Sequence, residues 1–243
     1  MTEFENINFE EIIDEGIGIL SQEINLSDFD NKETDELQTE FPILPVRNMV
    51  MFPKVIIPIT AGREKSKKLL EEAQKENRFI GIISQKNPNE ENPTEKDLYA
   101  IGTLAKILKI IRLPEGNITA ITRGVQRFKI KKMLTSEPYF LAEITKQKDS
   151  QPKDKEEFSA LIDNIRDLAE KIINIDPNIP NAAQFAIKNI DGEEDMLNFV
   201  SANGNFSADK KQLLLDEKTL LGRAKALYQM MHDDYRHLEL KNQ

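Results

Sequence analysis

Apolar and polar residues follow two different patterns along the chain. From Phe41 to about Lys148, short apolar runs are separated by turn residues, a pattern typical of β-strands. After Pro152 the apolar residues recur about every 3.6 positions, the period of an α-helix. The sequence therefore predicts a strand-rich region followed by a helical region, with the boundary near residue 150.

The strand-rich region is expected to contain short strands and one long hairpin. Apolar runs predict strands at residues 43–46, 55–60 and 79–84. The prolines in the first two runs confine them to sheet edges, bulges or strand ends. A helix is expected from Arg63 to Glu76. Residues 102–113 and 117–133 flank the turn sequence Pro-Glu-Gly-Asn and should pair as an antiparallel hairpin, with a bulge or bend at Gly124.

The helical region begins with a single apolar stripe from Phe158 to Ile173, which predicts a long helix. Shorter helices are expected from Asn181, over 193–202 and after Ser207. A final helix should run from Asp216 almost to the last residue. Because no glycine or proline ends it, we expect this helix to continue in a longer protein.

Charge is distributed unevenly. Residues 1–40 hold 13 acidic side chains and one lysine, out of 42 acidic and 33 basic residues in the whole chain. The rest of the chain therefore has 32 basic and 29 acidic residues and is close to neutral. Self-repulsion opposes compaction of so acidic a segment, and we expect residues 1–40 to form a largely disordered tail.

Three sequence blocks resemble the amino-terminal domain of Lon proteases. They are FPILPVRNMVMFPKVIIPITAGREKSKKLLEEA, LYAIGTLAKILKIIRLPEGNITAITRGVQRFKI and EPYFLAEI. The resemblance covers residues 41–243 and implies an α+β chain. The implied parts are a PUA-like small β-barrel with one or two helices over 41–149, and an α-helical bundle over 150–243.

The resemblance also implies a function. Such a region is the non-catalytic, substrate-recognising and oligomer-supporting part of an ATP-dependent serine protease that degrades misfolded and regulatory proteins as a hexamer. ATP and Mg²⁺ belong to the implied parent. This chain carries no glycine-rich phosphate loop followed by Lys, and we expect it to bind no cofactor and catalyse no reaction. The alternative is a stand-alone Lon-domain adaptor that binds peptide or RNA.

Composition favours a cytoplasmic protein. Cysteine is absent, which excludes disulfides and thiolate chemistry. The opening residues lack the pattern of a secretory signal, and no apolar run approaches the roughly 20 residues that span a bilayer. The two histidines, His232 and His237, are five residues apart and hence on different faces of a helix, so no metal site is expected.

One candidate substrate-binding segment consists of Met49, Val50, Met51, Phe52 and Pro53. Methionine side chains are flexible and polarisable, which suits a surface that accepts varied apolar partners such as unfolded or misfolded protein. The competing interpretation is that these residues fill the barrel interior.

A basic cluster is the second candidate surface. Residues 101–132 contain eight Lys or Arg and one Glu. Alternation along the hairpin suggests a cationic sheet face that could dock a protein or the acidic tail, formed by Lys106, Arg112, Arg127, Lys129 and Lys131. Scarce aromatic stacking residues disfavour nucleic acid as the partner, and an ordinary solvated face is the third interpretation.

Overall fold

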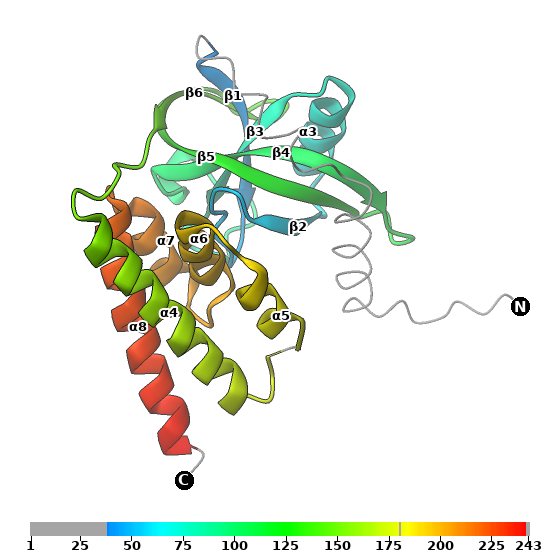
Figure 1. Cartoon of the computed structure of the whole chain (residues 1–243). Coiled ribbons are helices and arrows are strands. Elements are labelled where there is room, and N and C mark those ends of the chain that lie inside the picture. Colours follow the sequence, from blue (N-terminus) through cyan, green and yellow to red (C-terminus); the bar gives the residue numbers. More distant parts are fainter. Residues whose placement is uncertain (1–37, 180, 242–243) are drawn as a thin grey trace, which may run out of the picture. The chain divides into compact units, whose positions relative to one another are not determined.

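The computed structural model describes residues 38–179 and 181–241 (Figure 1). The predicted acidic tail lies almost entirely outside these residues. The strands are β1 (Glu40–Val46), β2 (Ile56–Ala61), β3 (Phe79–Ser84), β4 (Ile101–Arg112), β5 (Ile118–Thr135) and β6 (Phe140–Gln147). The helices are α3 (Glu64–Lys75), α4 (Lys155–Ile175), α5 (Asn181–Asn189), α6 (Glu193–Asn203), α7 (Ala208–Asp216) and α8 (Leu220–Lys241), with a single 3₁₀ turn at Glu95–Asp97.

The six strands form one sheet that closes on itself. Their order is β2-β5-β4-β3-β1-β6, and an additional pairing between β5 and β6 completes the ring. Closure depends on β5, an 18-residue strand that pairs with β2 over 118–123, with β4 over 118–129 and with β6 over 127–135. The predicted small β-barrel is therefore confirmed as a near-closed pseudo-barrel, and the helices that follow it complete the predicted α+β fold.

The predicted hairpin is formed by β4 and β5, and its bulge lies beside Gly124. Leu104 pairs with Gln126 and Ala105 with Gly124, so one residue of β5 has no partner across the ladder. A Cβ at Gly124 would lie 2.1 Å from the carbonyl oxygen of Phe52. Only glycine therefore lets the segment before β2 pass this close to β5.

Helix α3 closes one end of the barrel. Its buried side chains Leu69, Leu70 and Ala73 form the stripe expected from the sequence. They pack with strand residues such as Leu44, Ile80 and Ala105 in one apolar cluster. Ser66 is buried as well, and the charged side chains of α3 lie on its exposed or partly exposed faces.

Helices α4 and α8 lie side by side and run in the same direction (Figure 1). Just before they begin, Ser150 and Thr219 form a parallel bridge. Helix α8 starts at Leu220, four residues later than predicted, because the Thr219 hydroxyl accepts the Gly222 N–H at 3.0 Å and so caps the helix.

The barrel and the helices share an apolar core. Val50, Phe52 and Val55, from the segment before β2, are buried in the same cluster as Phe158 of α4 and Leu227 of α8. Residues 39–243 form one compact unit. The change from strands to helices after Gln147 therefore falls inside a continuous hydrophobic structure.

Candidate functional site

The barrel carries an open groove of about 720 Å³. Its walls come from the first turns of α3, the end of β1, residues 91–95, the end of β5 and the start of β6. Its apolar lining consists of Ile43, Leu44, Pro45, Leu69, Pro93, Met133, Leu134, Tyr139 and Phe140. This volume is within the roughly 300–1,000 Å³ typical of ligand-binding pockets.

The groove exists because two neighbouring strands differ in extent. Strand β6 begins at Phe140, opposite Ile43, whereas β1 continues to Val46 with β3 as its partner. Beyond Ile43, the position beside β1 holds no strand of the described chain. The groove occupies that position, and Leu134 at the end of β5 stands at its side with 40% of its surface exposed.

Arg63 holds one wall of the groove. Its Nη2 donates to Gln85 Oε1 at 2.8 Å and to the Glu90 carbonyl at 3.1 Å, which fixes the loop that ends at residue 95. Burial lowers the pKa of the Arg63 guanidinium, as does nearby Arg47, while the carboxylates of Glu90 and Glu91 oppose the shift. The loop is therefore tied to the start of α3 by a charge-assisted contact.

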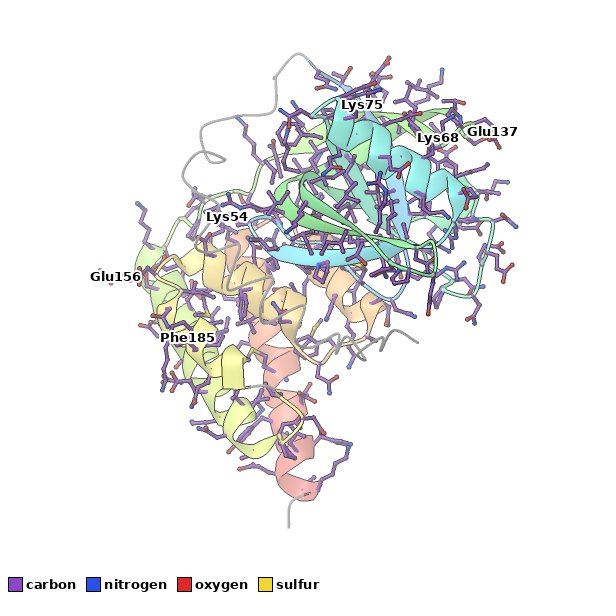
Figure 2. All side chains as sticks on the ribbon, turned by 90° about the vertical axis from the view of Figure 1, so that its right-hand side faces the viewer. Lys54, Lys68, Lys75, Glu137, Glu156 and Phe185 are labelled. Carbon is purple, nitrogen blue, oxygen red and sulfur yellow. The ribbon has the colours of Figure 1, made fainter. Side chains whose placement is uncertain are left out.

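The opposite wall, formed by the end of β5, the turn after it and the start of β6, is attached to α3 in two ways. The Tyr139 hydroxyl donates to Glu72 Oε2 at 2.7 Å, and burial followed by this hydrogen bond raises the pKa of Tyr139. Lys65 forms an ion pair with Glu137, which projects beside α3 near Lys68 in Figure 2. Both partners are more than half exposed, so this pair contributes at most about 1 kcal/mol and can part readily.

The groove has a mixed apolar and polar lining. Its described lining contains apolar side chains, hydroxyls and separated charges, without a histidine or cysteine. In the part of the chain that the structure describes, no group of three or more His, Asp or Glu side chains is arranged to hold a metal ion.

The helices of the described chain are too short or too polar to cross a membrane. His232 and His237 are both exposed on α8.

The segment predicted to bind substrate, Met49 to Pro53, is divided between two cores. Val50 and Phe52 point into the helical core, whereas Met51 points into the barrel core. Phe52 is fully buried, Pro53 is buried, and Met49 alone is partly exposed. The substrate-binding role of this segment stays a prediction, but four of its five residues are buried, because successive side chains of an extended segment face opposite sides and here both sides are covered.

The predicted cationic face is interrupted and largely paired. Arg112 pairs with Glu71 and Lys131 with Glu143, while Lys106 lies over the Phe79 ring and donates to the Asn77 carbonyl. Lys129 is exposed.

Arg127 does not belong to this face. Its side chain is 3% exposed, because the side of β5 that it occupies is covered by the segment joining α7 to α8. The prediction that Arg127 lies on an exposed docking surface is wrong for this reason.

Arg127 instead joins a buried ionic cluster between barrel and helices. Asp149 Oδ1 accepts hydrogen bonds from Arg127 Nη2 and, at 2.8 Å, from Arg223 Nη2. Arg223 also donates to Asn198 Oδ1 at 2.9 Å and to the Leu214 carbonyl at 3.1 Å. Burial lowers the pKa of Arg223, and Asp149 opposes this shift.

Glu194 lies within electrostatic reach of this cluster. Its pKa is raised first by burial and then by the negative charges of Asp149 and Asp195. Lys54 and Arg223 oppose the shift. Lys54 itself pairs with Asp195 at 2.7 Å, where the segment before β2 meets α6 (Figure 2). The folded environment thus disfavours the ionised form of Glu194 relative to water.

Sequence reasoning did not find the groove, although one signal for it was present. Met133 and Leu134 are adjacent apolar residues in a strand, and regular alternation would place one of them on the outside of the barrel. In the structure Leu134 is the unpaired residue of a β-bulge between Met133 and Thr135. Which segments would surround it depends on how β1 and β6 pair, and that pairing has no local signature.

Comparison with known proteins gives a consistent result. Residues 40–233 match the family model described as the ATP-dependent protease La (LON) substrate-binding domain. The chain is 43% identical over 216 residues to a Lon protease of Flavobacterium johnsoniae, covering 88% of this chain and 26% of that protein. It is 41% identical over 212 residues to a Lon protease of Cytophaga hutchinsonii, covering 87% and 26%. The chain thus spans about a quarter of the length of these curated relatives.

Solved structures share the fold. The N-terminal domain of Mycobacterium avium complex Lon protease matches with a TM-score of 0.62 and 18% identity, over 80% of this chain and 98% of that one. A Lon N-terminal domain protein from Xanthomonas campestris matches with a TM-score of 0.57 and 16% identity, over 78% and 97%.

Proposed function

Since this chain belongs to the family of Lon substrate-binding domains, we propose that it binds unfolded or misfolded protein segments in the groove between α3, β1 and the end of β5. The observation that carries the proposal is the exposure of Leu134 on an apolar wall, beside a stretch of β1 that has no strand neighbour on that side among the described residues. A large apolar side chain at 40% exposure costs free energy in water, and burial by a substrate recovers it.

The parent activity forms part of the same proposal. The chain is the non-catalytic part of a longer ATP-dependent serine protease, in which ATP, Mg²⁺ and the peptidase residues are supplied by other domains. That protease works in the cytoplasm as a hexamer. A stand-alone adaptor is the alternative, and a transcript that continues past Gln243 would decide against it. RNA binding has less support, because Arg127 is buried and Arg112 and Lys131 are paired with carboxylates.

Affinity should come from copy number. One groove must offset the loss of rotational and translational freedom on binding, so the isolated chain is expected to bind unfolded protein weakly. Six linked grooves that contact one flexible substrate typically gain about 10²- to 10⁴-fold. Fusion of the chain to a six-fold symmetric scaffold should therefore bring binding of an unfolded protein into the measurable range.

Leu134→Ser tests the site. Covering the exposed part of one leucine is worth about 1 kcal/mol, or roughly fivefold in Kd for each groove. Fluorescence anisotropy with a reduced and alkylated protein would measure the loss, with Leu213→Ser as the matched control. Leu213 is 63% exposed on α7 and does not line the groove. Equal affinities of the two variants would contradict the proposed site.

A further inference from the structure

The stretch of β1 that has no described strand neighbour on the groove side raises the question of how a polypeptide would lie beside it. An extended segment can add to an open sheet edge as a further strand, held by backbone hydrogen bonds. Alternatively, it can lie in the groove and be held by its side chains. In the first mode the substrate backbone must form hydrogen bonds with β1, and in the second it need not. The backbone groups that β1 presents to the groove distinguish the two modes.

The backbone of β1 presents proline to the groove. The Thr39 carbonyl accepts the Ile144 N–H, so the backbone N–H and C=O groups of odd-numbered β1 residues point toward β6. The Val46 carbonyl accepts the Gln85 N–H, so the backbone groups of even-numbered residues point toward β3. Beyond Ile43, the next residue that faces the groove is Pro45, which lines it. Proline has no N–H, so this edge offers one carbonyl where a strand would require both a donor and an acceptor.

The edge also ends soon after Pro45. Strand β1 stops at Val46, and Asn48 adopts a positive φ of 54°, which turns the chain away from the extended direction. A single hydrogen bond contributes only about 0.5–1.5 kcal/mol, too little to order an added strand.

The outer edge of β2 is blocked in the same way. The Val55 carbonyl accepts the Gly124 N–H, so alternate residues from Val55 onward face β5. Pro58 therefore faces outward, on an edge with no strand partner in the described chain. Outward-facing prolines are a common means of preventing edge-to-edge pairing.

We infer that the groove holds extended segments by their large apolar side chains and does not add them to the sheet as a strand. This inference rests on the proposed function of the groove. It concerns the mode of binding: the side chains of the extended segment supply the contacts, and its backbone N–H groups contribute little to affinity. Met133, Leu134, Tyr139 and Phe140 supply the apolar contacts.

Backbone ester substitution tests this inference, because an ester removes the N–H donor while keeping the side chains. The probe is a short fluorescein-labelled peptide in which Leu and Phe alternate with Ser. Two further peptides carry esters at alternate positions, one for each edge, and a fourth replaces Leu and Phe with Ala. Anisotropy titrations use the whole chain and its Leu134→Ser variant.

Both ester peptides should bind within about threefold of the parent peptide, whereas the Ala peptide should lose about tenfold or more. Leu134→Ser should weaken the parent and ester peptides by the same factor. A tenfold loss for either ester peptide would overturn the inference while leaving the groove as the binding site. Absence of binding by every peptide, or binding indifferent to Leu134→Ser, would instead contradict the proposed function on which the inference rests.

Discussion

Replacing Asp149 with alanine should destabilise the protein more than loss of an exposed ion pair. The Asp149 carboxylate accepts from Arg127 and Arg223, whose side chains are 3% and 0% exposed, and is itself 9% exposed. Its removal leaves two buried guanidinium groups without the carboxylate that accepts hydrogen bonds from both. Breaking such a pair typically costs about 3–5 kcal/mol. For a folded unit of this size, that loss lowers the Tm by roughly 6–20 °C.

Urea denaturation followed by circular dichroism measures this cost directly. Lys225→Ala provides the control, because it removes a pair with Glu157 in which both side chains are about half exposed. That change should cost at most about 1 kcal/mol. If Asp149→Ala and Lys225→Ala have the same free energy of unfolding, the ionic cluster does not hold the barrel against the helices as described.

Three further predictions concern the same interface. Gly116→Ala should lower the free energy of unfolding by roughly 1–2 kcal/mol through left-handed backbone strain alone, because a Cβ at Gly116 meets nothing within 4 Å. Gly124→Ala should cost more, because the new Cβ would lie 2.1 Å from a backbone oxygen. Equal thermal midpoints of the two variants would contradict this. Phe52→Ala should lose about 3–5 kcal/mol by urea denaturation, and Met49→Ala much less; comparable losses would contradict the division between cores. Because the pKa of Glu194 is raised on folding, its ionisation lowers the free energy of unfolding as pH rises from the pKa of the unfolded state through that of the folded state. Glu194→Gln should therefore stabilise the protein at neutral pH and have little effect below the pKa of the unfolded state. A uniform effect at all pH values would refute this.

Local patterns in the sequence were sufficient to predict most of the individual elements. The β4–β5 hairpin is specified by its own turn residues, and Gly116 adopts the positive φ of 83° that the turn requires. The stripe on α4 is likewise local, and its helix extends only a few residues beyond the predicted ends. Such elements depend on residues close together in the chain.

Features that depend on distant pairing were not predicted. Alternation along β5 assigned Arg127 to one face of the strand, but it carried no information that α7 and α8 would cover that face. The same limit applies to Val50 and Phe52, because the second core that receives them is formed by residues more than a hundred positions later. Predicting the groove would have required the register between β1 and β6, which only the closed sheet defines.

The proposal that this groove binds unfolded protein is tested most directly by methyl NMR of the whole chain during titration with a reduced and alkylated protein. Even weak binding would shift the methyl signals of residues at the site. The account predicts the largest shifts at Met133 and Leu134, with the buried methyls of Val50 and Met51 unchanged. Shifts centred on the helical region, or none at Leu134 when the ligand is in large excess, would contradict it.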